Sequence, residues 1–462
     1  MTSTCGEHGE LVTVPETRRL GRWVRRAGFA FAFLIAARVI AIGVDRGRAL
    51  QRAAPEVFLG AAPLVGRDFN DGWDWRFGLG LVGAGIVGLV VTVAVWRQWF
   101  WRVRLRFVVL ATAAAAMAFA TALALTDGAD GVLHGASDDT EYLSNLGIAP
   151  PADEFLRTFV DQLDRYSVHI RGHPPGFLLV LKFLDFIHLR GAWPVAMLSV
   201  LGAGIVVVAT LIAVWAVAGG QWVRRAAPFL VVVPYALWLV TSADAVYAAV
   251  GASGAAAVAV ALRLTSWRAS AVGLAGGLLL GSLLFLTYLG VVFVLVPVGI
   301  VGVAATQRRL GALWAVAGAV AGGAVVIMAF RLAGFWWIDG ARRTRTEYWE
   351  GTAQFRSWDY FRFGNIAVAL IALGPAVFAG LLRLRDRRMW VLVGGGLAAL
   401  AVSHVTQYTR GEVERIWLPL YPWLAIGAAA LAPRAGRRSA AMWLGVQAVC
   451  AILLQAALVS KW

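Results

Sequence analysis

The chain has 462 residues, of which 60% are hydrophobic and 15% are charged, and its formal net charge is +16 at pH 7. The apolar residues lie in runs of about 17 to 25, the length that crosses the core of a bilayer, which excludes a soluble globular protein. Only two cysteines are present, which excludes a disulfide framework or a cysteine-ligated metal site, and arginines that flank apolar runs indicate membrane topology rather than nucleic-acid binding.

The apolar runs predict an all-α polytopic membrane protein with about 13 transmembrane helices in one domain. Residues 1–26 mix acids with arginines and are predicted to form a cytoplasmic tail, and residues 27–462 are predicted to form the membrane domain. In chain order, the predicted spans are 28–44, 77–96, 107–126, 192–217, 226–240, 245–263, 271–288, 291–305, 310–328, 365–382, 390–405, 416–432 and 441–459.

Arginine clusters predict which side of the membrane each loop faces. With these spans, the clusters at 97–106, 224–225 and 383–388 fall on one side, which the positive-inside rule identifies as the cytoplasm. Segments 127–191 and 335–364 then face outward as a first and a second outer loop. The richness in Arg, Ala and Val is typical of a high-GC bacterium, so the expected location is a bacterial plasma membrane.

Two parts of the first outer loop are predicted to lie on the membrane surface. Residues 153–165 place apolar side chains such as Phe155 and Phe159 on one helical face, which indicates an amphipathic helix. Residues 177–189 are apolar, but they carry Lys182 and two other polar side chains and are short for a crossing. This second segment is predicted to be interfacial or re-entrant.

Adjacent acids at the start of this loop are the candidate catalytic residues. Asp138 and Asp139 precede Glu141 and Tyr142, and a carboxylate here can remove a proton from an acceptor hydroxyl. Because adjacent acids repel each other, one of them is expected to hold its proton more readily. The alternative is structural, because Asp138 followed three residues later by Glu141 is also a helix capping box.

Cations follow in the same loop, within and after the run His169-Ile-Arg-Gly-His173-Pro-Pro-Gly176. The prolines predict an extended stop followed by a new helix. Arg171, His173 and Lys182 are candidates to bind a phosphate at the start of that helix. The alternative is a simple helix start with a solvated histidine.

The second outer loop carries arginines against the positive-inside preference. Arg342, Arg343 and Arg345 lie there among tryptophans, together with Arg356 and Arg362. They are predicted to bind a phosphate or diphosphate lipid headgroup, while the alternative is an aromatic belt with arginines that reach anionic lipid.

A further outward loop, residues 404–415, ends in Arg415. Its guanidinium is a candidate for the same phosphate pocket. The alternative is that Arg415 only pairs with a nearby glutamate, such as Glu412 or Glu414, at the start of the next helix.

Several of these short motifs together resemble the GT-C membrane glycosyltransferases of the protein O-mannosyltransferase and aminoarabinose-transferase type. The similar elements are Asp139-Thr140-Glu141-Tyr142, His173 before two prolines, Asp244 after Pro234 and Ser242, and Arg415 before Pro419 and Pro422. One residue separates the acids and the tyrosine is closer than in the family pattern, so the choice between Asp138 and Asp139 stays open.

The resemblance implies a membrane enzyme whose donor is a sugar on a polyprenyl phosphate. The acceptor would be a glycan, lipid or protein of the cell envelope, and an Asp base with cationic groups on the leaving phosphate would invert the anomeric configuration. No cofactor is certain, although Asp139 and Glu141 can supply oxygen ligands to a divalent cation.

Other classes of function also fit parts of the pattern. A transporter or flippase of a lipid-linked or anionic substrate is expected to place charges in broken helices near the middle of the membrane, whereas here the polar residues concentrate in outward loops. A non-catalytic assembly subunit is a third possibility, and it predicts that replacing Asp138 and Asp139 leaves function intact.

Overall fold

The computed structural model describes residues 16–54, 59–66, 73–306, 311–433 and 436–459, without the side chains of 16–25, 305 and 306. Residues 1–15 of the predicted tail lie outside these ranges. Ten helices of the described residues are long and apolar enough to cross a bilayer. They are α1 (Glu16–Ala53), α3 (Leu79–Trp96), α5 (Leu105–Ala124), α10 (Ala192–Ala218), α12 (Asp244–Ala261), α13 (Ser266–Leu286), α16 (Ala312–Leu332), α18 (Trp358–Arg383), α19 (Arg387–Val405) and α22 (Arg437–Ala457).

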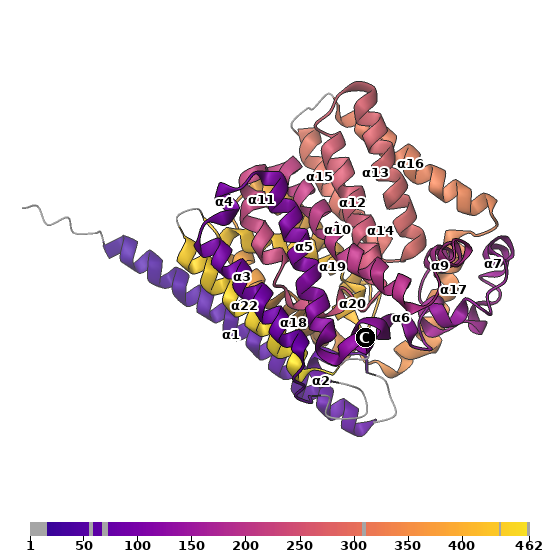
Figure 1. The fold of residues 1–462 in the computed structure, drawn as a ribbon, viewed down its shortest axis with the longest axis horizontal. Coiled ribbons are helices and arrows are strands. Elements are labelled where there is room, and N and C mark those ends of the chain that lie inside the picture. The colour runs from indigo at the N-terminus through magenta and orange to yellow at the C-terminus, as the bar shows by residue number, and fades with distance from the viewer. Residues whose placement is uncertain (1–15, 55–58, 67–72, 307–310, 434–435, 460–462) are drawn as a thin grey trace, which may run out of the picture.

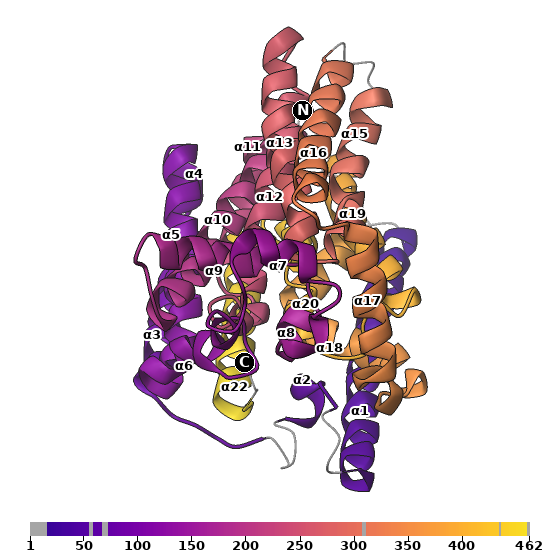
Figure 2. The ribbon, with the colours of Figure 1, turned by 90° about the vertical axis from the view of Figure 1, so that its right-hand side faces the viewer.

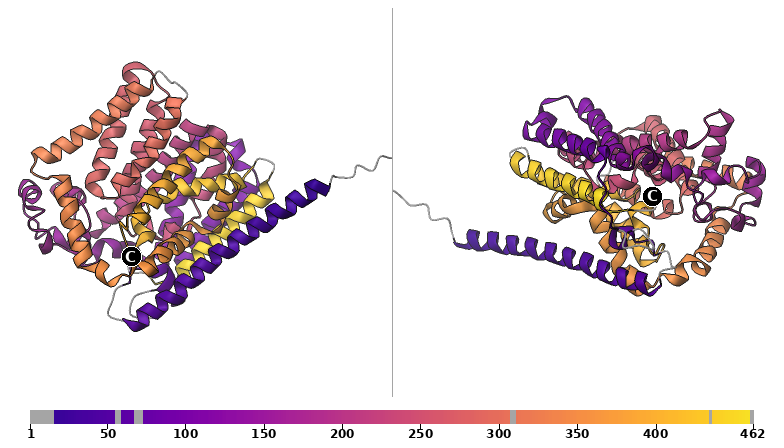
Figure 3. Two further views of the ribbon diagram at one scale, coloured as in Figure 1. Left: turned by 180° about the vertical axis from the view of Figure 1, so that it is seen from behind. Right: turned by 60° about the horizontal axis from the view of Figure 1, so that its bottom comes forward.

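These helices confirm the predicted all-α polytopic membrane class. Each corresponds to one of the predicted spans, because an apolar run of this length satisfies most of its backbone hydrogen bonds within itself. Helix α18 differs from the others in having a break at Gly374. Helix α1 lies on the outside of the bundle against α18 and α22, where Phe33 contacts Phe378 and Trp443 (Figure 3).

The other three predicted spans are shorter or interrupted, so the predicted number of about 13 transmembrane helices is not confirmed. Proline is one physical cause, since Pro228, Pro234, Pro419 and Pro422 lack the N–H that a continuous helix needs. The elements that replace continuous helices there are α11 (Gly220–Ala226), η4 (Ala227–Leu230), η5 (Pro234–Trp238), α14 (Gly290–Phe293), α15 (Leu295–Thr306), α20 (Val413–Ile416), α21 (Tyr421–Ala425) and η7 (Ile426–Leu431).

Two of these interrupted segments, 227–242 and 417–429, are buried along their whole length. Irregular backbone is tolerated at membrane depth only where protein surrounds it, which explains their central position. The first segment joins opposite ends of the bundle. Before it, Arg224 Nη1 donates to Val103 O at 2.8 Å, and at its far end Ser242 O accepts from Ser199 Oγ at 3.0 Å near the start of α10.

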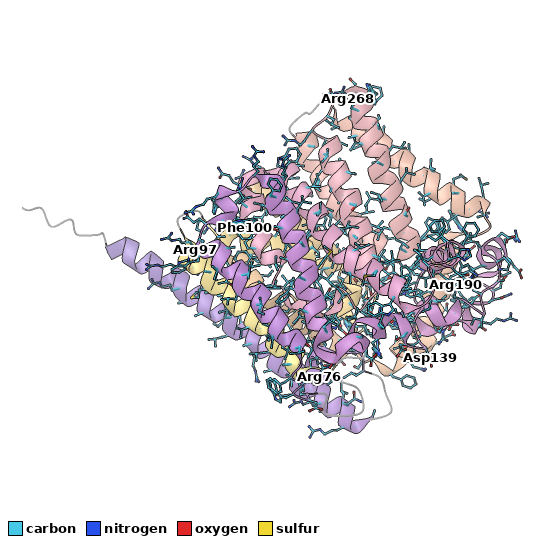
Figure 4. The ribbon with its side chains drawn as sticks, viewed as in Figure 1. Arg76, Arg97, Phe100, Asp139, Arg190 and Arg268 are labelled. Atoms are coloured by element: carbon cyan, nitrogen blue, oxygen red, sulfur yellow. The ribbon has the colours of Figure 1, made fainter. Side chains whose placement is uncertain are left out.

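The bundle therefore has two distinct ends. Helices α4 (Trp99–Arg102) and α11 lie at one end, and α6 (Gly128–Ser137), α9 (Gly176–Phe186) and α17 (Trp337–Glu350) lie toward the other (Figure 1). Arg97 and Phe100 mark the first end and Asp139 and Arg190 the second (Figure 4). We call the second end the loop end, and it contains the parts of segments 127–191 and 335–364 that lie outside the long helices.

Short helices build the loop end from the two predicted outer loops. The predicted amphipathic helix at 153–165 is divided into α7 (Ala152–Thr158) and η3 (Leu163–Arg165), and its apolar face, including Phe155 and Phe159, is buried. Helix α9 has 11 residues, a length of about 16 Å that is too short to cross a bilayer. Helices α7, α8 (Val168–Arg171), α9 and α17 face the viewer in Figure 2.

Candidate functional site

A buried arginine, Arg415 in α20, contacts the first outer loop. Its Nη1 donates to Asp244 Oδ2 at 3.2 Å, and its Nη2 donates to Glu412 Oε2 at 2.6 Å. Nη2 also lies 3.0 Å from Nε2 of His169. Only 7% of the Arg415 side chain is exposed. Three segments that are far apart in the sequence therefore meet at one guanidinium, and we call the residues around it the Arg415 cluster.

The contacts of His169 require one tautomer. Its Nδ1 lies 2.9 Å from Thr140 O and 3.1 Å from Glu141 Oε1, and a carbonyl or carboxylate oxygen only accepts. Nδ1 therefore carries the proton, and the lone pair of Nε2 accepts from Arg415. Burial, reinforced by the charge of Arg415, lowers the pKa of His169 well below its ordinary value. His169 is thus a neutral connector between the first loop and Arg415.

Glu412 joins Arg415 to a second buried arginine. Its Oε1 accepts from Arg356 Nη2 at 2.9 Å, and the Arg356 side chain is 1% exposed. Although burial opposes ionisation, Arg356 and Arg415 lower the pKa of Glu412 to about 2. The carboxylate therefore stays ionised and bridges both guanidinium groups.

The backbone of Glu412 is unusual as well. Its φ of 57° lies in the left-handed region that residues other than glycine rarely adopt. The N–H of Glu412 donates to Gly60 O at 2.6 Å, which helps to hold this conformation. Such strain persists only where the surroundings enforce it, and it concentrates at functional sites.

Tyr142 and His173 lie beside the Arg415 cluster, and both side chains are neutral. The hydroxyl of Tyr142 lies 2.9 Å from that of Tyr247, and its ring centroid is 5.8 Å from that of His173. Nδ1 of His173 donates to His169 O at 2.9 Å. Burial raises the pKa of Tyr142 and lowers the pKa of His173. Both residues offer hydrogen bonds and ring faces rather than a charge.

Local sequence explains how these side chains are placed. Helix α8 is a single turn that ends before Pro174 and Pro175, which cannot continue it and instead start α9. His169 and His173 consequently bracket this turn. At the start of α12, Ser242 Oγ donates to Asp244 Oδ2 at 2.7 Å and orients the carboxylate toward Arg415.

The candidate acids Asp138 and Asp139 lie nearer the surface than Glu141. Asp139 is exposed, and 24% of the Asp138 side chain is exposed. Oδ1 of Asp138 accepts from the Thr140 N–H at 2.8 Å and from the Thr140 hydroxyl, so Asp138 caps a turn. Glu141 turns to His169, and the N–H of Asp138 donates to His134 O instead of to Glu141. The reciprocal half of the capping box is therefore replaced by other contacts.

Arg171 and Arg343 hold the two outer loops together. Arg343 Nη2 lies 3.1 Å from Asp164 Oδ1, and its Nη1 lies 2.7 Å from Glu347 Oε1. Arg171 Nη1 lies 3.5 Å from the second oxygen of Glu347. These ion pairs link α17 to the first loop, so both arginines have carboxylate partners that are distinct from those of Arg415.

The other predicted substrate-binding cations also have contacts of their own. Lys182 Nζ donates to Ala149 O at 2.9 Å. Arg342 is 79% exposed beside Asp339, and the Arg345 guanidinium lies 5.7 Å from the ring centroid of Trp349. Of the predicted site residues, Glu141, Tyr142, His173, Asp244 and Arg415 are therefore the ones gathered at the Arg415 cluster.

Sequence reasoning did not select His169 and Glu412 as site residues, and it placed Arg356 only among the arginines of the second outer loop. His169 had a signal, because it lies four positions before His173 on the same turn. Glu412 and Arg356 are 56 positions apart, and only the fold identifies which acid faces which base.

Metal binding finds no ready ligand group at the cluster. His169 and His173 have a chelating spacing, but each Nδ1 contacts a backbone carbonyl. Across the described residues there is no group of three or more side chains suited to a metal ion.

A small cavity of about 10 Å³ lies beside the cluster. Tyr142 and Phe177 are among the residues that line it, and it has room for about one water molecule.

Comparison with models of protein families finds no match. Comparison with curated protein sequences finds no match either. What the Arg415 cluster does is therefore inferred from its residues and their geometry.

The buried histidines predict that the folded protein is destabilised by mild acid. His169 and His173 have lowered pKa values in the fold, so below about pH 6.5 the unfolded chain binds more protons and stability falls as pH falls. Glu412 adds a separate loss below about pH 4.5, as pH approaches its folded pKa of about 2. We expect the melting temperature in detergent to fall between pH 7 and 5.

In a variant with both His169→Gln and His173→Gln, the melting temperature should fall less between pH 7 and 5 than it does in the parent. His134→Gln is the matched control, because the side chain of His134 is 49% exposed. If the melting temperature falls equally with pH in the parent, the double variant and the control, the buried histidines do not cause the loss of stability.

Proposed function

We propose that this chain is a GT-C-type membrane glycosyltransferase that transfers a sugar from a polyprenyl-phosphate donor to a glycan, lipid or protein acceptor. The observation that supports this most is the convergence of Glu141, Tyr142, His173, Asp244 and Arg415 at one end of the bundle. Each lies in a short motif that resembles this family, and the motifs are spread over most of the chain.

The proposed reaction uses an exposed carboxylate and a buried guanidinium. Asp139 or Asp138 removes the proton of the acceptor hydroxyl, whose oxygen forms a bond to the anomeric carbon. The bond from that carbon to the phosphate oxygen breaks, and its electron pair leaves with the polyprenyl phosphate. Arg415 stabilises the developing charge on that phosphate. Attack opposite the leaving group inverts the anomeric configuration.

The proposed topology has about 13 crossings, with the interrupted segments added to the ten long helices. The first interrupted segment supports this count, because it joins the end near Val103 to the end near Ser199. With the arginine-rich end in the cytoplasm of a bacterium, the Arg415 cluster faces outward. A lipid-linked donor would then reach it from the outer leaflet.

A transporter or flippase is the alternative, and the interrupted segments 227–242 and 417–429 are the observation that favours it. Carriers commonly bind substrates where helices are broken. Here, however, neither interrupted segment contains a charged residue. Asp244 and Arg415 lie just beyond them at the loop end, which agrees better with chemistry at the membrane surface than with a site at mid-membrane.

The test is transfer of labelled sugar from a panel of polyprenyl-phosphate donors by the purified protein in nanodiscs. We expect the parent to transfer from at least one donor. Either Asp138→Asn or Asp139→Asn should lower kcat by about 10² to 10⁴, the contribution of a general base, while donor binding persists.

Asp161→Asn is the control for this assay, because Asp161 is an exposed acid in the same loop and should retain full activity. Full activity of both Asp138→Asn and Asp139→Asn would remove the proposed base. An absence of transfer from every donor, combined with movement of labelled lipid between leaflets, would identify a flippase instead.

A further inference from the structure

The two buried arginines of the site already have a carboxylate bound between them. Arg356 and Arg415 each donate to a different oxygen of Glu412, at 2.9 and 2.6 Å. Arg415 also donates to Asp244. A phosphate that binds these guanidinium groups must therefore exchange with a carboxylate, because it needs the same N–H donors.

Carboxylates already surround Arg415. Asp244 and Glu412 each accept a hydrogen bond from it, and Glu141 contacts His169, which in turn contacts Arg415. Arg356 also donates to Glu412, and burial keeps His169 and His173 neutral at pH 7. Each further negative charge is therefore less favourable at this site than beside the arginines alone.

The backbone at Glu412 is held independently of its carboxylate. Its left-handed φ of 57° follows Gly411, whose φ is 92°. The N–H of Glu412 donates to Gly60 O at 2.6 Å, a main-chain contact that does not involve the arginines. The carboxylate can therefore leave the arginines without a change in this contact.

Building on the proposed function, we propose that Glu412 is a resident counter-anion that yields Arg356 and Arg415 to the donor phosphate. Together with Asp244 and Glu141, it makes the site prefer a singly charged phosphodiester to a doubly charged phosphomonoester. Glu412 is thus a specificity residue that acts through the two arginines.

This preference matches the charge change in the proposed reaction. The donor is a phosphodiester with one negative charge. When the bond from sugar to phosphate breaks, the electron pair remains on the phosphate oxygen and the product is a phosphomonoester with two. Arg415 stabilises this charge as it develops. The carboxylates beside it keep the doubly charged product from being held as tightly as the arginines alone would hold it, and returning Glu412 to the arginines completes the exchange.

The experiment compares two probes that share one lipid and differ in charge, farnesyl phosphate and its methyl ester, at pH 8. Binding is measured by titration calorimetry with the purified full-length protein in detergent. We expect the parent to bind the methyl ester more tightly than the monoester. Glu412→Gln should shift the ratio of the two affinities toward the monoester by about tenfold, the effect of one fewer charge at such a site. Asp339→Asn, which removes an exposed acid beside Arg342, should leave the ratio unchanged.

Equal weakening of both probes in Glu412→Gln would overturn the proposal, because a residue with only a structural role does not change the ratio. Should Glu412→Gln fail to fold, Asp244→Asn removes another carboxylate from Arg415 and must shift the ratio in the same direction. Sugar transfer by a parent that shows no preference between the probes would refute this inference and leave the proposed function standing. A parent that binds neither probe and transfers no sugar would refute both.

Discussion

Replacing Arg415 with methionine is expected to lower the free energy of unfolding by about 3–5 kcal/mol, because it leaves buried acids without their cation. Asp244 and Glu412 both lose an ion pair, and His169 loses the donor to its Nε2. Arg415 is also the proposed phosphate ligand, so sugar transfer should be lost in the same variant. Unfolding is followed by tryptophan fluorescence during denaturant titration in mixed micelles.

A second substitution tests whether the loss of stability comes from the ion pairs of Arg415 or from a wider disturbance of its surroundings. Arg415→Met combined with Glu412→Gln should cost about 1–2 kcal/mol less than the sum of the two single substitutions, since contacting residues couple by such amounts. The matched control is Arg342→Met, which removes an arginine that is 79% exposed and 4.0 Å from Asp339, and it should change stability by less than about 0.5 kcal/mol. A loss for Arg415→Met as small as that of the control would show that the cluster contributes little to stability.

The long helices of this fold were predictable because a bilayer imposes a strong rule on sequence. Runs such as 192–217 and 441–459 must be apolar and helical at once, and the structure has α10 and α22 there. Segments 226–240 and 416–432 are just as apolar. Hydropathy counts side chains and does not register backbone breaks, so it could not distinguish a spanning helix from an interrupted segment that is buried inside the bundle.

The site was predictable where a residue type carried its own signal. The prolines before α9 and the acids at 138–141 marked the first loop, Arg415 was selected because it ends an outward loop, and Asp244 was found through resemblance. The prediction that the arginines of α17 bind a phosphate headgroup had less support. A count of charges could not show that Glu347 and Asp164 pair with Arg343. Partners of opposite charge could not be assigned before the fold placed Arg356 beside Glu412.

Gln447→Leu is the second substitution with a large expected effect, because Gln447 joins the two sides of a break in α18. The helix is interrupted at Gly374, whose φ is 76°, and at Pro375. Nε2 of Gln447, in α22, donates to Leu373 O at 2.7 Å, and its Oε1 accepts from the Ala376 N–H at 2.8 Å. Both backbone groups lie in a fully buried apolar region, where an unpaired polar group costs several kcal/mol.

We expect Gln447→Leu to reduce the free energy of unfolding by about 2–4 kcal/mol, the cost of two buried groups left without partners. Thr92→Val in α3 is the matched control. It also removes a side-chain hydrogen bond inside a membrane helix, from Thr92 Oγ1 to Gly88 O at 2.8 Å, but no break is present there and the carbonyl keeps its helical partner. Thr92→Val should therefore lower the free energy of unfolding by less than about 1 kcal/mol.

Hydrogen exchange measured by mass spectrometry on the peptide that spans residues 370–380 gives a local readout for the same pair of variants. Faster exchange in Gln447→Leu alone would show that the glutamine holds the break closed. Equal losses in the two variants would contradict this, and would mean that α18 tolerates the break through packing alone. The break in α18 also lies against the interrupted segment 227–242. A Cβ atom at Gly374 would be 2.8 Å from Pro234 Cγ of that segment, which leads to Asp244. Loosening α18 there should therefore also disturb the carboxylate that orients Arg415.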